Sequence, residues 1–228
     1  TSAAQSYLPV YCQSVACTQD PNNADAFLIF GGDGAMLHAI NRFHELQKPF
    51  IGVNTGTRGY LMNNTPDPCE FRHVLNQVKF HSLWMLEAHV SSQNENFTAY
   101  GFNDIWVERR GNQTLRMQIT LDGVLQPSLL VGDGILFCTP QGSTGYNLAL
   151  RGKAIAPGVP VIQVTPISCV VNKSALGSII LSDNAVIEVA FKHIEKRPGQ
   201  FICDGIDMGH EPVQRLRVQK SEATVQLG

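Results

Sequence analysis

The sequence predicts an α/β domain followed by an all-β domain. We expect an N-terminal Rossmann-like parallel α/β domain and then a C-terminal β-rich, sandwich-like domain. Three observations support this: a buried strand pattern that enters a glycine turn, helical spacing after that turn, and many short β-type segments after about residue 80. We place the domains at residues 1–80 and 81–228, and the final strand or tail can return to the first domain.

The first domain begins with a strand, a helix and a second strand. Residues 24–30 (ADAFLIF) are almost continuously apolar, as expected of a short strand buried on both faces. In residues 35–47 apolar side chains recur at spacings of four, three and three, which is one face of a helix. Lys48-Pro49 ends that helix and residues 50–53 form the next strand. This βαβ order implies a parallel sheet.

The remaining elements follow from shorter patterns. A second helix is expected from about Asp67 to Val78. A helical insertion is expected at roughly Thr144 to Gly152, and Asp122-Gly123 predicts a two-residue hairpin turn. The expected strands share β-branched and aromatic residues between turn residues, and they are Leu83–Val90, Tyr100–Glu108, Leu115–Leu121, Gly134–Thr139, Val161–Thr165, Ala185–Phe191 and Val213–Val218.

Composition and charge narrow the class of protein. The net charge of −2 and the isoelectric point near 6.3 provide no basic field, so we expect no nucleic-acid partner. No apolar run reaches the length of a membrane span, and no charged-then-apolar leader is visible, so we expect no membrane partner and a cytoplasmic location.

The six cysteines are scattered, without a CxxC pair or a histidine at metal-ligand spacing. We interpret them as reduced thiols. The seven histidines form neither HxH nor HExxH, so we expect no zinc site and name no metal-ligating residue.

The glycine turn at residues 31–34 (GGDG) is the first chemical motif. Glycines let the backbone approach a ligand and expose N–H groups at a helix N-terminus, which favours phosphate. Asp33 would repel phosphate, but its carboxylate suits proton removal from an attacking hydroxyl or the binding of Mg²⁺. A tight turn with a helix cap is the alternative. The sequence contains neither a GxxxxGK[ST] loop nor GxGxxG.

The second motif is residues 132–147 (GDGILFCTPQGSTGYN). A strand ends in Thr-Pro, and a loop of small polar residues leads to an aromatic residue near a helix start. Hydroxyls and amides there can bind sugar or phosphate oxygens, and Tyr146 can stack on a base or hydrogen-bond to it. An ordinary strand-to-helix turn capped by Ser143 or Thr144 is the alternative.

Together these motifs resemble the NAD kinase family, from about Ala24 to about Val218. GGDG alone is shared with lipid kinases and phosphofructokinases, whereas the Thr-Pro-rich stretch is more specific. The segments that carry the resemblance, in chain order, are 31–34, 54–56 with Gly59-Tyr60, Asn103-Asp104 and 132–147.

The resemblance implies a site between an N-terminal domain that carries GGDG and a C-terminal NAD-binding domain. It implies that Asp33 is the general base on the ribose hydroxyl. It also implies the nucleotide contacts: Gly31, Gly32 and Gly34 at the phosphate turn, Asn103 and Asp104 on ribose or adenine-side groups, Asp133 toward the nicotinamide, and Thr144, Gly145 and Tyr146 on adenine and ribose. Tyr60 is expected among the cofactor-binding residues. It takes Asp204-Gly205 as a structural turn.

The resemblance further implies phosphorylation of the 2′-hydroxyl of the adenosine ribose of NAD to give NADP. The donor would be ATP or polyphosphate, with Mg²⁺ or another divalent cation beside ATP. A homodimer or homotetramer is expected, in which a neighbouring subunit often completes the NAD pocket.

Several positions depart from the family pattern. Ala35 replaces a common Thr, residues 54–60 read NTGTRGY, Gln141 and Gly145 fill variable places, and Arg151-Gly152-Lys153 replaces Gly-Gly-Pro. The two cations either bind phosphate or form a solvated helix end. A catalytically silent NAD-binding sensor and, less strongly, a GGDG-type lipid kinase therefore stay as alternatives.

Overall fold

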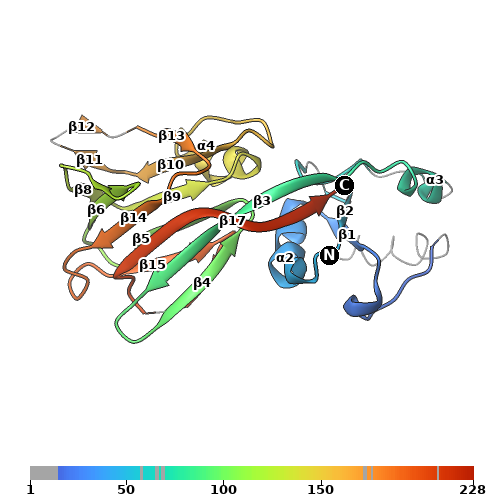
Figure 1. Cartoon of the computed structure of the whole chain (residues 1–228), viewed down its shortest axis with the longest axis horizontal. Helices are drawn as coiled ribbons and strands as arrows, with labels where there is room; N and C mark the ends of the chain where they lie inside the picture. The colour runs from blue at the N-terminus through green and yellow to red at the C-terminus, as the bar shows by residue number, and fades with distance from the viewer. Residues whose placement is uncertain are drawn as a thin grey trace. The chain divides into compact units, whose positions relative to one another are not determined.

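The chain divides into two units with different architectures. The computed structural model describes residues 15–56, 59–64, 67, 70–171, 174–175, 177–209 and 211–228. Unit 1 is Thr1–Leu83 with Ala223–Gly228, and unit 2 is Trp84–Glu222. Figure 1 shows the elements of each unit.

Unit 1 contains the βαβ arrangement that the sequence predicts. Strand β1 (Phe27–Gly31) pairs in parallel with β2 (Phe50–Asn54), from Phe27 opposite Phe50 to Gly31 opposite Asn54. Helix α2 (Asp33–Phe43) connects them and packs on β1 and β2 (Figure 1). The helix buries Met36, Ala39 and Ile40, so its apolar spacing is used for packing.

Two short 3₁₀ helices complete this part of unit 1, η1 (Pro21–Asn23) and η2 (His44–Leu46). The chain leaves η2 at Gln47, which adopts a left-handed conformation with φ of 53°.

The second helix is shorter than the predicted 67–78. Helix α3 covers only Phe71–Leu75, and Pro68 and Cys69 lie outside the described residues. Beyond α3, Gln77 donates to the Val74 carbonyl and Val78 to the Leu75 carbonyl, which are three-residue rather than four-residue hydrogen bonds. The tighter turn continues the apolar periodicity, which explains why the sequence pattern suggests a longer helix.

Unit 2 contains two sheets. In the first, the order is β17-β14-β6-β8-β11-β12, with β3 paired to β17 and β4, and β7 paired to β6. The strands of this sheet are β3 (His81–Ser91), β4 (Asn96–Gly101), β6 (Leu115–Leu121), β7 (Val124–Leu125), β8 (Leu130–Gly132), β11 (Val170–Val171), β12 (Ser174–Ala175), β14 (Ile187–Phe191) and β17 (Arg215–Leu227).

The second sheet has the order β13-β10-β9-β5-β15-β16, and all its pairs are antiparallel. Its strands are β5 (Asp104–Arg109), β9 (Gly134–Cys138), β10 (Val161–Ile167), β13 (Ile179–Ser182), β15 (Gly199–Cys203) and β16 (Ile206–Asp207). One apolar cluster holds residues from both sheets, including Val107 and Phe137 from the second and Met117 and Val189 from the first. The two sheets therefore share one core, as in a sandwich.

Two expectations for unit 2 are wrong in detail. The predicted strand Tyr100–Glu108 is broken, because β4 ends at Gly101 and β5 begins at Asp104. The helical insertion also lies earlier than Thr144–Gly152 and is interrupted, since it consists of η3 (Gln141–Thr144) and α4 (Tyr146–Ala149). Gly145 separates η3 from α4 with a non-helical backbone, φ −82° and ψ −131°.

The hairpin prediction and the fold class are confirmed. Asp122 and Gly123 join β6 to β7 with φ of 49° and 78°, the left-handed pair that a type I′ turn requires. The chain is an α/β unit with a β-rich unit of two sheets and few helices. Among the described residues, none of the helices is both long enough and apolar enough to cross a membrane.

Candidate functional site

Asp33 begins helix α2 and binds a second loop. Its Oδ2 accepts the Tyr60 backbone N–H at 2.9 Å and its Oδ1 accepts the Leu61 backbone N–H at 2.9 Å. These bonds hold the carboxylate in one orientation and tie the glycine turn to the segment after β2. Each oxygen keeps a further lone pair for a proton or a cation.

The three glycines of the GGDG turn have different reasons to be glycine. A Cβ on Gly31 would lie 2.7 Å from the Ala35 Cβ, so close packing of strand and helix requires Gly31. A Cβ on Gly32 or Gly34 would meet nothing within 4 Å. The described protein therefore leaves open space over Gly32 and Gly34, which is what a ligand that approaches the backbone needs. Ala35, which replaces a common Thr, provides the surface that Gly31 contacts.

Tyr60 contributes to this turn through its backbone rather than its ring. Its N–H binds Asp33, while the residue is 75% exposed. The neighbouring Gly59 is sterically required, because its Cβ would lie 2.8 Å from Met62 and 3.0 Å from Asp33 Oδ1. Thr57 and Arg58, where the turn departs from the family pattern, lie outside the described residues.

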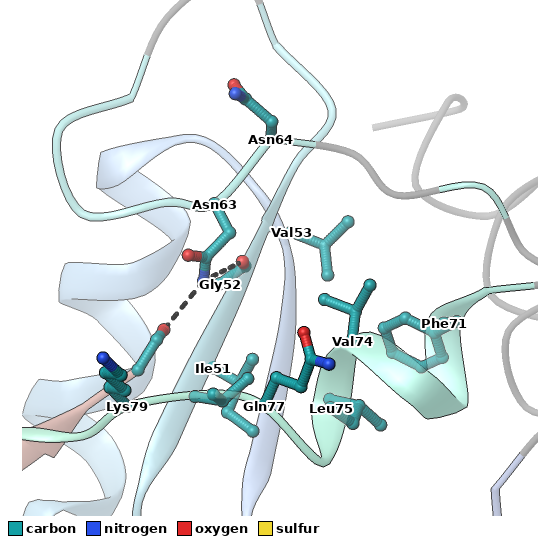
Figure 2. A pocket seen from close by; sticks show the side chains of 12 residues that line it. Ile51, Gly52, Val53, Asn63, Asn64, Phe71, Val74, Leu75, Gln77 and Lys79 are labelled. Carbon is teal, nitrogen blue, oxygen red and sulfur yellow. Dashed lines mark hydrogen bonds between the residues drawn. The ribbon is translucent and has the colours of Figure 1, made fainter.

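Unit 1 also has a cavity away from this turn. Figure 2 shows its lining from β2 and α3, with Ile51, Val53 and Phe71 on the apolar side and Asn63 donating to the Gly52 carbonyl. Its volume is about 370 Å³. None of the candidate site residues lines it, so this cavity is not the candidate site.

In unit 2, Asn103 and Asp104 lie on a turn that one carboxylate organises. Asp204 Oδ1 accepts the backbone N–H of Asn103 at 2.7 Å and of Asp104 at 3.0 Å, and Oδ2 accepts that of Phe102 at 2.8 Å. Asp204 is only 9% exposed. We call residues 102–104 the 102–104 turn. The N–H groups of Phe102 and Asn103, which lie between β4 and β5, are thus bound to Asp204 rather than to a neighbouring strand.

The carbonyls of the 102–104 turn are bound by the second motif. Thr139 Oγ1 donates to the Phe102 carbonyl at 2.7 Å, and the Thr139 backbone N–H donates to the Asn103 carbonyl at 2.9 Å. Gln141 Nε2 also donates to the Phe102 carbonyl at 3.0 Å. A Cβ on Gly142 would lie 2.1 Å from the Asn103 carbonyl oxygen, so this glycine is needed for the approach. The structure thus joins the two sequence motifs of unit 2.

Asp104 is a buried carboxyl with a strongly altered acidity. It is 5% exposed, and burial raises its pKa to about 7, with a further contribution from the negative charge of Asp204. Two other neighbours, the Tyr146 phenol and the Cys138 thiol, stay neutral near pH 7. Burial raises the pKa of the Tyr146 phenol, and nearby carboxylates led by Glu108 raise it further. Burial, followed by the charge of Asp104, holds the pKa of the Cys138 thiol well above its usual range.

Tyr146 packs edge-on against Trp106, with ring centroids 5.1 Å apart and an interplanar angle of 61°. Both rings pack against the buried cluster of Leu136, Cys138 and Ile167. Within the described part of the chain, Trp106 Nε1, Asn103 Oδ1 and Gln141 Oε1 are buried atoms without a hydrogen-bond partner. Such atoms are the ones a bound ligand or water satisfies.

A buried asparagine fixes the loop that carries Thr144, Gly145 and Tyr146. Asn147 is fully buried, its Nδ2 donates to the Ser143 carbonyl at 3.0 Å, and its Oδ1 accepts from Thr165 Oγ1 at 2.6 Å. Gly145 is exposed and Thr144 is partly buried.

Asp133 is placed differently from the other candidates of unit 2. Its Oδ1 forms an ion pair with Arg109 Nε at 2.6 Å, and both side chains are about one-third exposed. The flanking glycines are packing residues, because a Cβ would lie 2.2 Å from Cys169 Sγ at Gly132 and 2.2 Å from the Val107 carbonyl at Gly134. The structure gives Asp133 a cationic partner in its own unit.

In the Arg151-Gly152-Lys153 segment, close packing requires glycine at position 152. A Cβ on Gly152 would lie 2.0 Å from Asn147 Oδ1, and Arg151 has a left-handed φ of 66°. Arg151 and Lys153 are exposed. Gly152 is therefore structural.

The structure brings the sequence candidates into two groups, each in its own unit. Unit 1 groups Gly31, Gly32, Asp33, Gly34 and Tyr60 around the start of α2. Unit 2 groups the others around the 102–104 turn and the loop 141–147, and Asp133 follows β8.

Sequence reasoning gave no individual role to Asp204, Trp106, Thr139 or Asn147, although Thr139 and Asn147 lie inside the motif at residues 132–147. For Asp204 the signal was Asp204-Gly205, a hairpin turn with φ of 47° and 81°. It predicts a turn but not the 102–104 contact.

Within the described residues, no group of three or more His, Cys, Asp or Glu side chains is placed to hold a metal ion. Mg²⁺ commonly uses one or two carboxylates together with substrate phosphates and water. The free lone pairs of Asp33 fit that mode. Cys138, Cys169 and Cys203 are buried free thiols, whereas Cys12 and Cys69 lie outside the described residues. Burial raises the pKa of Cys169 to about 11.

Comparison with known proteins identifies the family of this chain. The model of the ATP-NAD kinase N-terminal domain matches residues 2–81, and that of the ATP-NAD kinase C-terminal domain matches residues 103–227. The NAD kinase of Rhizobium meliloti (strain 1021) is 30% identical over 205 residues, which is 89% of this chain and 78% of the relative. The NAD kinase of Rickettsia akari (strain Hartford) is 34% identical over 183 residues, 79% of this chain and 71% of the relative.

Two solved structures have a similar fold. The yeast NADH kinase complexed with NADH matches with a TM-score of 0.77 and 25% identity, over 89% of this chain and 61% of the yeast chain. An NAD kinase from Archaeoglobus fulgidus in complex with ATP matches with a TM-score of 0.79 and 20% identity, over 100% of this chain and 90% of that chain. Because the C-terminal model alone matches more than half of its length, the chain belongs to the ATP-NAD kinase family.

Proposed function

We propose that this chain is an NAD kinase that phosphorylates the 2′-hydroxyl of the adenosine ribose of NAD with ATP to give NADP. Membership of the ATP-NAD kinase family and the relatives named NAD kinase support this proposal. Family membership also removes the reason to retain a GGDG-type lipid kinase.

The observation that carries the proposal is the fixed carboxylate of Asp33 at the start of α2. Two backbone N–H groups orient it, and the adjacent Gly32 and Gly34 leave the backbone open. A ribose hydroxyl is a weak nucleophile, so it must be oriented and must lose its proton as the phosphoryl group transfers. We assign the role of general base to Asp33, and phosphate contacts to Gly31, Gly32 and Gly34.

The second part of the proposal concerns the nucleotide contacts of unit 2. Asn103 has a buried side-chain oxygen without a partner in the described chain, which suits a donor on the ribose or adenine. We assign Asn103, Asp104, Thr144, Gly145 and Tyr146 to the adenosine part of a nucleotide.

Tyr60 is assigned to nucleotide contact because its ring is exposed. Asp133 is assigned to the nicotinamide end. The Asp133 carboxylate would contact the nicotinamide while it also forms its ion pair with Arg109.

ATP is the phosphoryl donor of this proposal, and polyphosphate is the alternative donor. Mg²⁺, or another divalent cation, would accompany ATP and neutralise phosphate charge, and the remaining lone pairs of Asp33 would hold it. The protein's own contribution is to orient the hydroxyl, accept its proton at Asp33 and present open N–H groups to phosphate oxygens.

We also propose a cytoplasmic homodimer or homotetramer, as the resemblance to the family implies. Among the residues that the structure describes, Val124, Leu125 and Ile180 are apolar side chains at least 49% exposed. Exposed apolar side chains of this kind are compatible with association between subunits.

The deciding experiment is a coupled assay for NADP formation from NAD, ATP and Mg²⁺, with Asp33→Asn beside the wild type. We expect the wild type to form NADP and Asp33→Asn to lose about 10²-fold or more of kcat, because a positioned base typically contributes that much. Asp25→Asn is the matched control, since Asp25 is an exposed carboxylate just before β1 in the same unit. It should keep wild-type activity.

Other outcomes of the assay separate the alternatives. If the wild type binds NAD but forms no NADP with ATP or with polyphosphate, the kinase proposal is wrong and the NAD-binding sensor replaces it. Full activity in Asp33→Asn would leave the kinase but remove the base assigned to it.

A further inference from the structure

We infer that Asp204 is a positioning residue for nucleotide binding, because its carboxylate holds the backbone of the 102–104 turn that carries Asn103 and Asp104. The inference rests on the proposed function, since it assigns Asp204 to the nucleotide contacts of the same site. It goes beyond the sequence expectation, in which Asp204-Gly205 is only a structural turn.

The hydrogen bonds of Asp204 converge on one short segment. Three consecutive N–H groups, those of Phe102, Asn103 and Asp104, point at its two oxygens over 2.7–3.0 Å. Such a row of N–H groups is an anion-binding arrangement, and here the anion is supplied by the protein itself. Without that carboxylate, three backbone donors in a largely buried turn would lack their partner.

The position of Asp204 is itself fixed. It lies in a left-handed conformation after β15, where Gly205 completes the turn, and its own N–H donates to the Asp104 carbonyl at 2.9 Å. The 102–104 turn therefore donates hydrogen bonds to the Asp204 carboxylate, and the Asp204 backbone N–H donates one back to the turn. Thr139 fixes the opposite, carbonyl side of the 102–104 turn. Hydrogen bonds therefore hold the backbone that carries Asn103 and Asp104 from both its N–H side and its carbonyl side.

A purely structural role would not require the negative charge of Asp204. A neutral acceptor could satisfy backbone N–H groups, whereas a carboxylate beside the buried Asp104 costs free energy through like-charge repulsion. The groups that face Asp104 are Asp204, Cys203 of β15, Cys138 of β9 and Tyr146 of α4. The pKa values of these two thiols and of the phenol are raised, so Asp204 is the charged neighbour in this set.

The test uses the full chain with Asp204→Asn and Asp204→Glu. Asp207→Asn is the matched control, because Asp207 is an exposed carboxylate of the same hairpin that accepts only the Gly209 N–H in the described contacts. Steady-state kinetics with NAD are measured from about pH 5.5 to 9, together with amide hydrogen exchange of residues 102–104.

We expect Asp204→Asn to raise KM for NAD roughly tenfold while kcat falls less, since buried N–H groups lose an acceptor and the turn shifts. Exchange protection should fall at residues 102–104 and stay unchanged in β9. Removing the charge lowers the pKa of Asp104, so the inflection of kcat/KM that Asp104 causes should move to lower pH. Asp204→Glu should raise KM but keep the inflection near its wild-type pH, and Asp207→Asn should match the wild type.

The inference is overturned if Asp204→Asn keeps the wild-type KM and pH profile, or if both Asp204 variants fail to fold while the control folds. In the second case Asp204 is a folding residue rather than a positioning one. A wild type that forms no NADP refutes the proposed function instead, and hydrogen exchange at residues 102–104 then decides the role of Asp204 alone.

Discussion

At the scale of single residues, Asp104 makes the stability of the protein depend on pH. An unfolded aspartate has a pKa near 3.9, whereas burial and the charge of Asp204 raise the pKa of Asp104 to about 7. Between these values the folded state binds the proton and the unfolded state does not. The contribution of Asp104 to stability is therefore largest at low pH and is lost as pH rises from about 4 through about 7.

We predict that Asp104→Asn, whose side chain cannot ionise, removes the loss of stability that Asp104 causes as pH rises. The free energy of unfolding of the variant should rise relative to the wild type between pH 5 and pH 7, by up to about 1.4 kcal/mol per pH unit for one proton. Urea unfolding of both proteins at several pH values measures the difference. A difference that stays constant over this range would show that Asp104 is ionised in the folded protein throughout.

The residues that sequence reasoning found are those whose signal is local. Asp33 stands inside a four-residue motif between a strand and a helix, so its position at the start of α2 follows from its neighbours. Asp204 acts on residues about a hundred positions earlier, and no short pattern encodes that contact. Trp106 shows the same limit, because strand alternation places its ring on one face but does not reveal that Tyr146 covers that face.

At the scale of elements, the turn between β1 and α2 contains two kinds of glycine. Gly31 is packed against Ala35, whereas Gly32 and Gly34 have open space where a side chain would lie. Gly34 lies in the first turn of α2, it is exposed, and a Cβ added to it would have no neighbour within 4 Å. Alanine in a helix is more stable than glycine by about 0.5–1 kcal/mol. If only folding mattered, alanine would be preferred at this position, and this supports the proposed phosphate contact of Gly34.

We predict that Gly34→Ala stabilises the protein by about 0.5–1 kcal/mol but raises KM for ATP roughly tenfold, because its methyl group takes space that phosphate needs. Gly31→Ala is the contrasting variant. It should destabilise by about 1–3 kcal/mol, since the added methyl meets Ala35 at 2.7 Å. Urea unfolding and the coupled assay measure both effects. Wild-type KM for ATP in Gly34→Ala would mean that phosphate does not approach this glycine.

Elements with a strong local pattern are predicted well, and those set by distant contacts are not. The strand Leu115–Leu121 and the turn at Asp122-Gly123 match their prediction because alternation and turn residues are local signals. The break between β4 and β5 is missed, because the residues on either side are all compatible with a strand and the N–H of Asn103 binds the distant Asp204. Strand β17 is predicted too short, since its polar second half resembles a loop in sequence.

At the scale of the whole molecule, the last residues of the chain complete unit 1. Strand β17 begins in unit 2, and from Ala223 onward its residues belong to unit 1. There Leu227 pairs in parallel with Phe50, Gly228 donates to the Phe50 carbonyl, and Asn63 Nδ2 donates to the Gly228 carbonyl. Two crossings of the chain, at β3 and at β17, connect the units covalently, so unit 1 cannot form completely until the rest of the chain has been made.

Because residues 223–228 belong to unit 1, we predict that a destabilising substitution there lowers the stability of unit 1. Val225 is 2% exposed and the preceding Thr224 is exposed, so Val225→Ala and Thr224→Ala form a matched pair. We expect Val225→Ala to destabilise unit 1 by about 2 kcal/mol, the cost of two buried methyl groups and the space they leave, while Thr224→Ala changes little. Hydrogen exchange resolves where the loss falls: amides of β2 should lose protection, and amides of β5 and β9 should keep theirs. Equal loss in all three strands would instead mean that the two units unfold as one cooperative body, and that the division by contacts has no counterpart in stability.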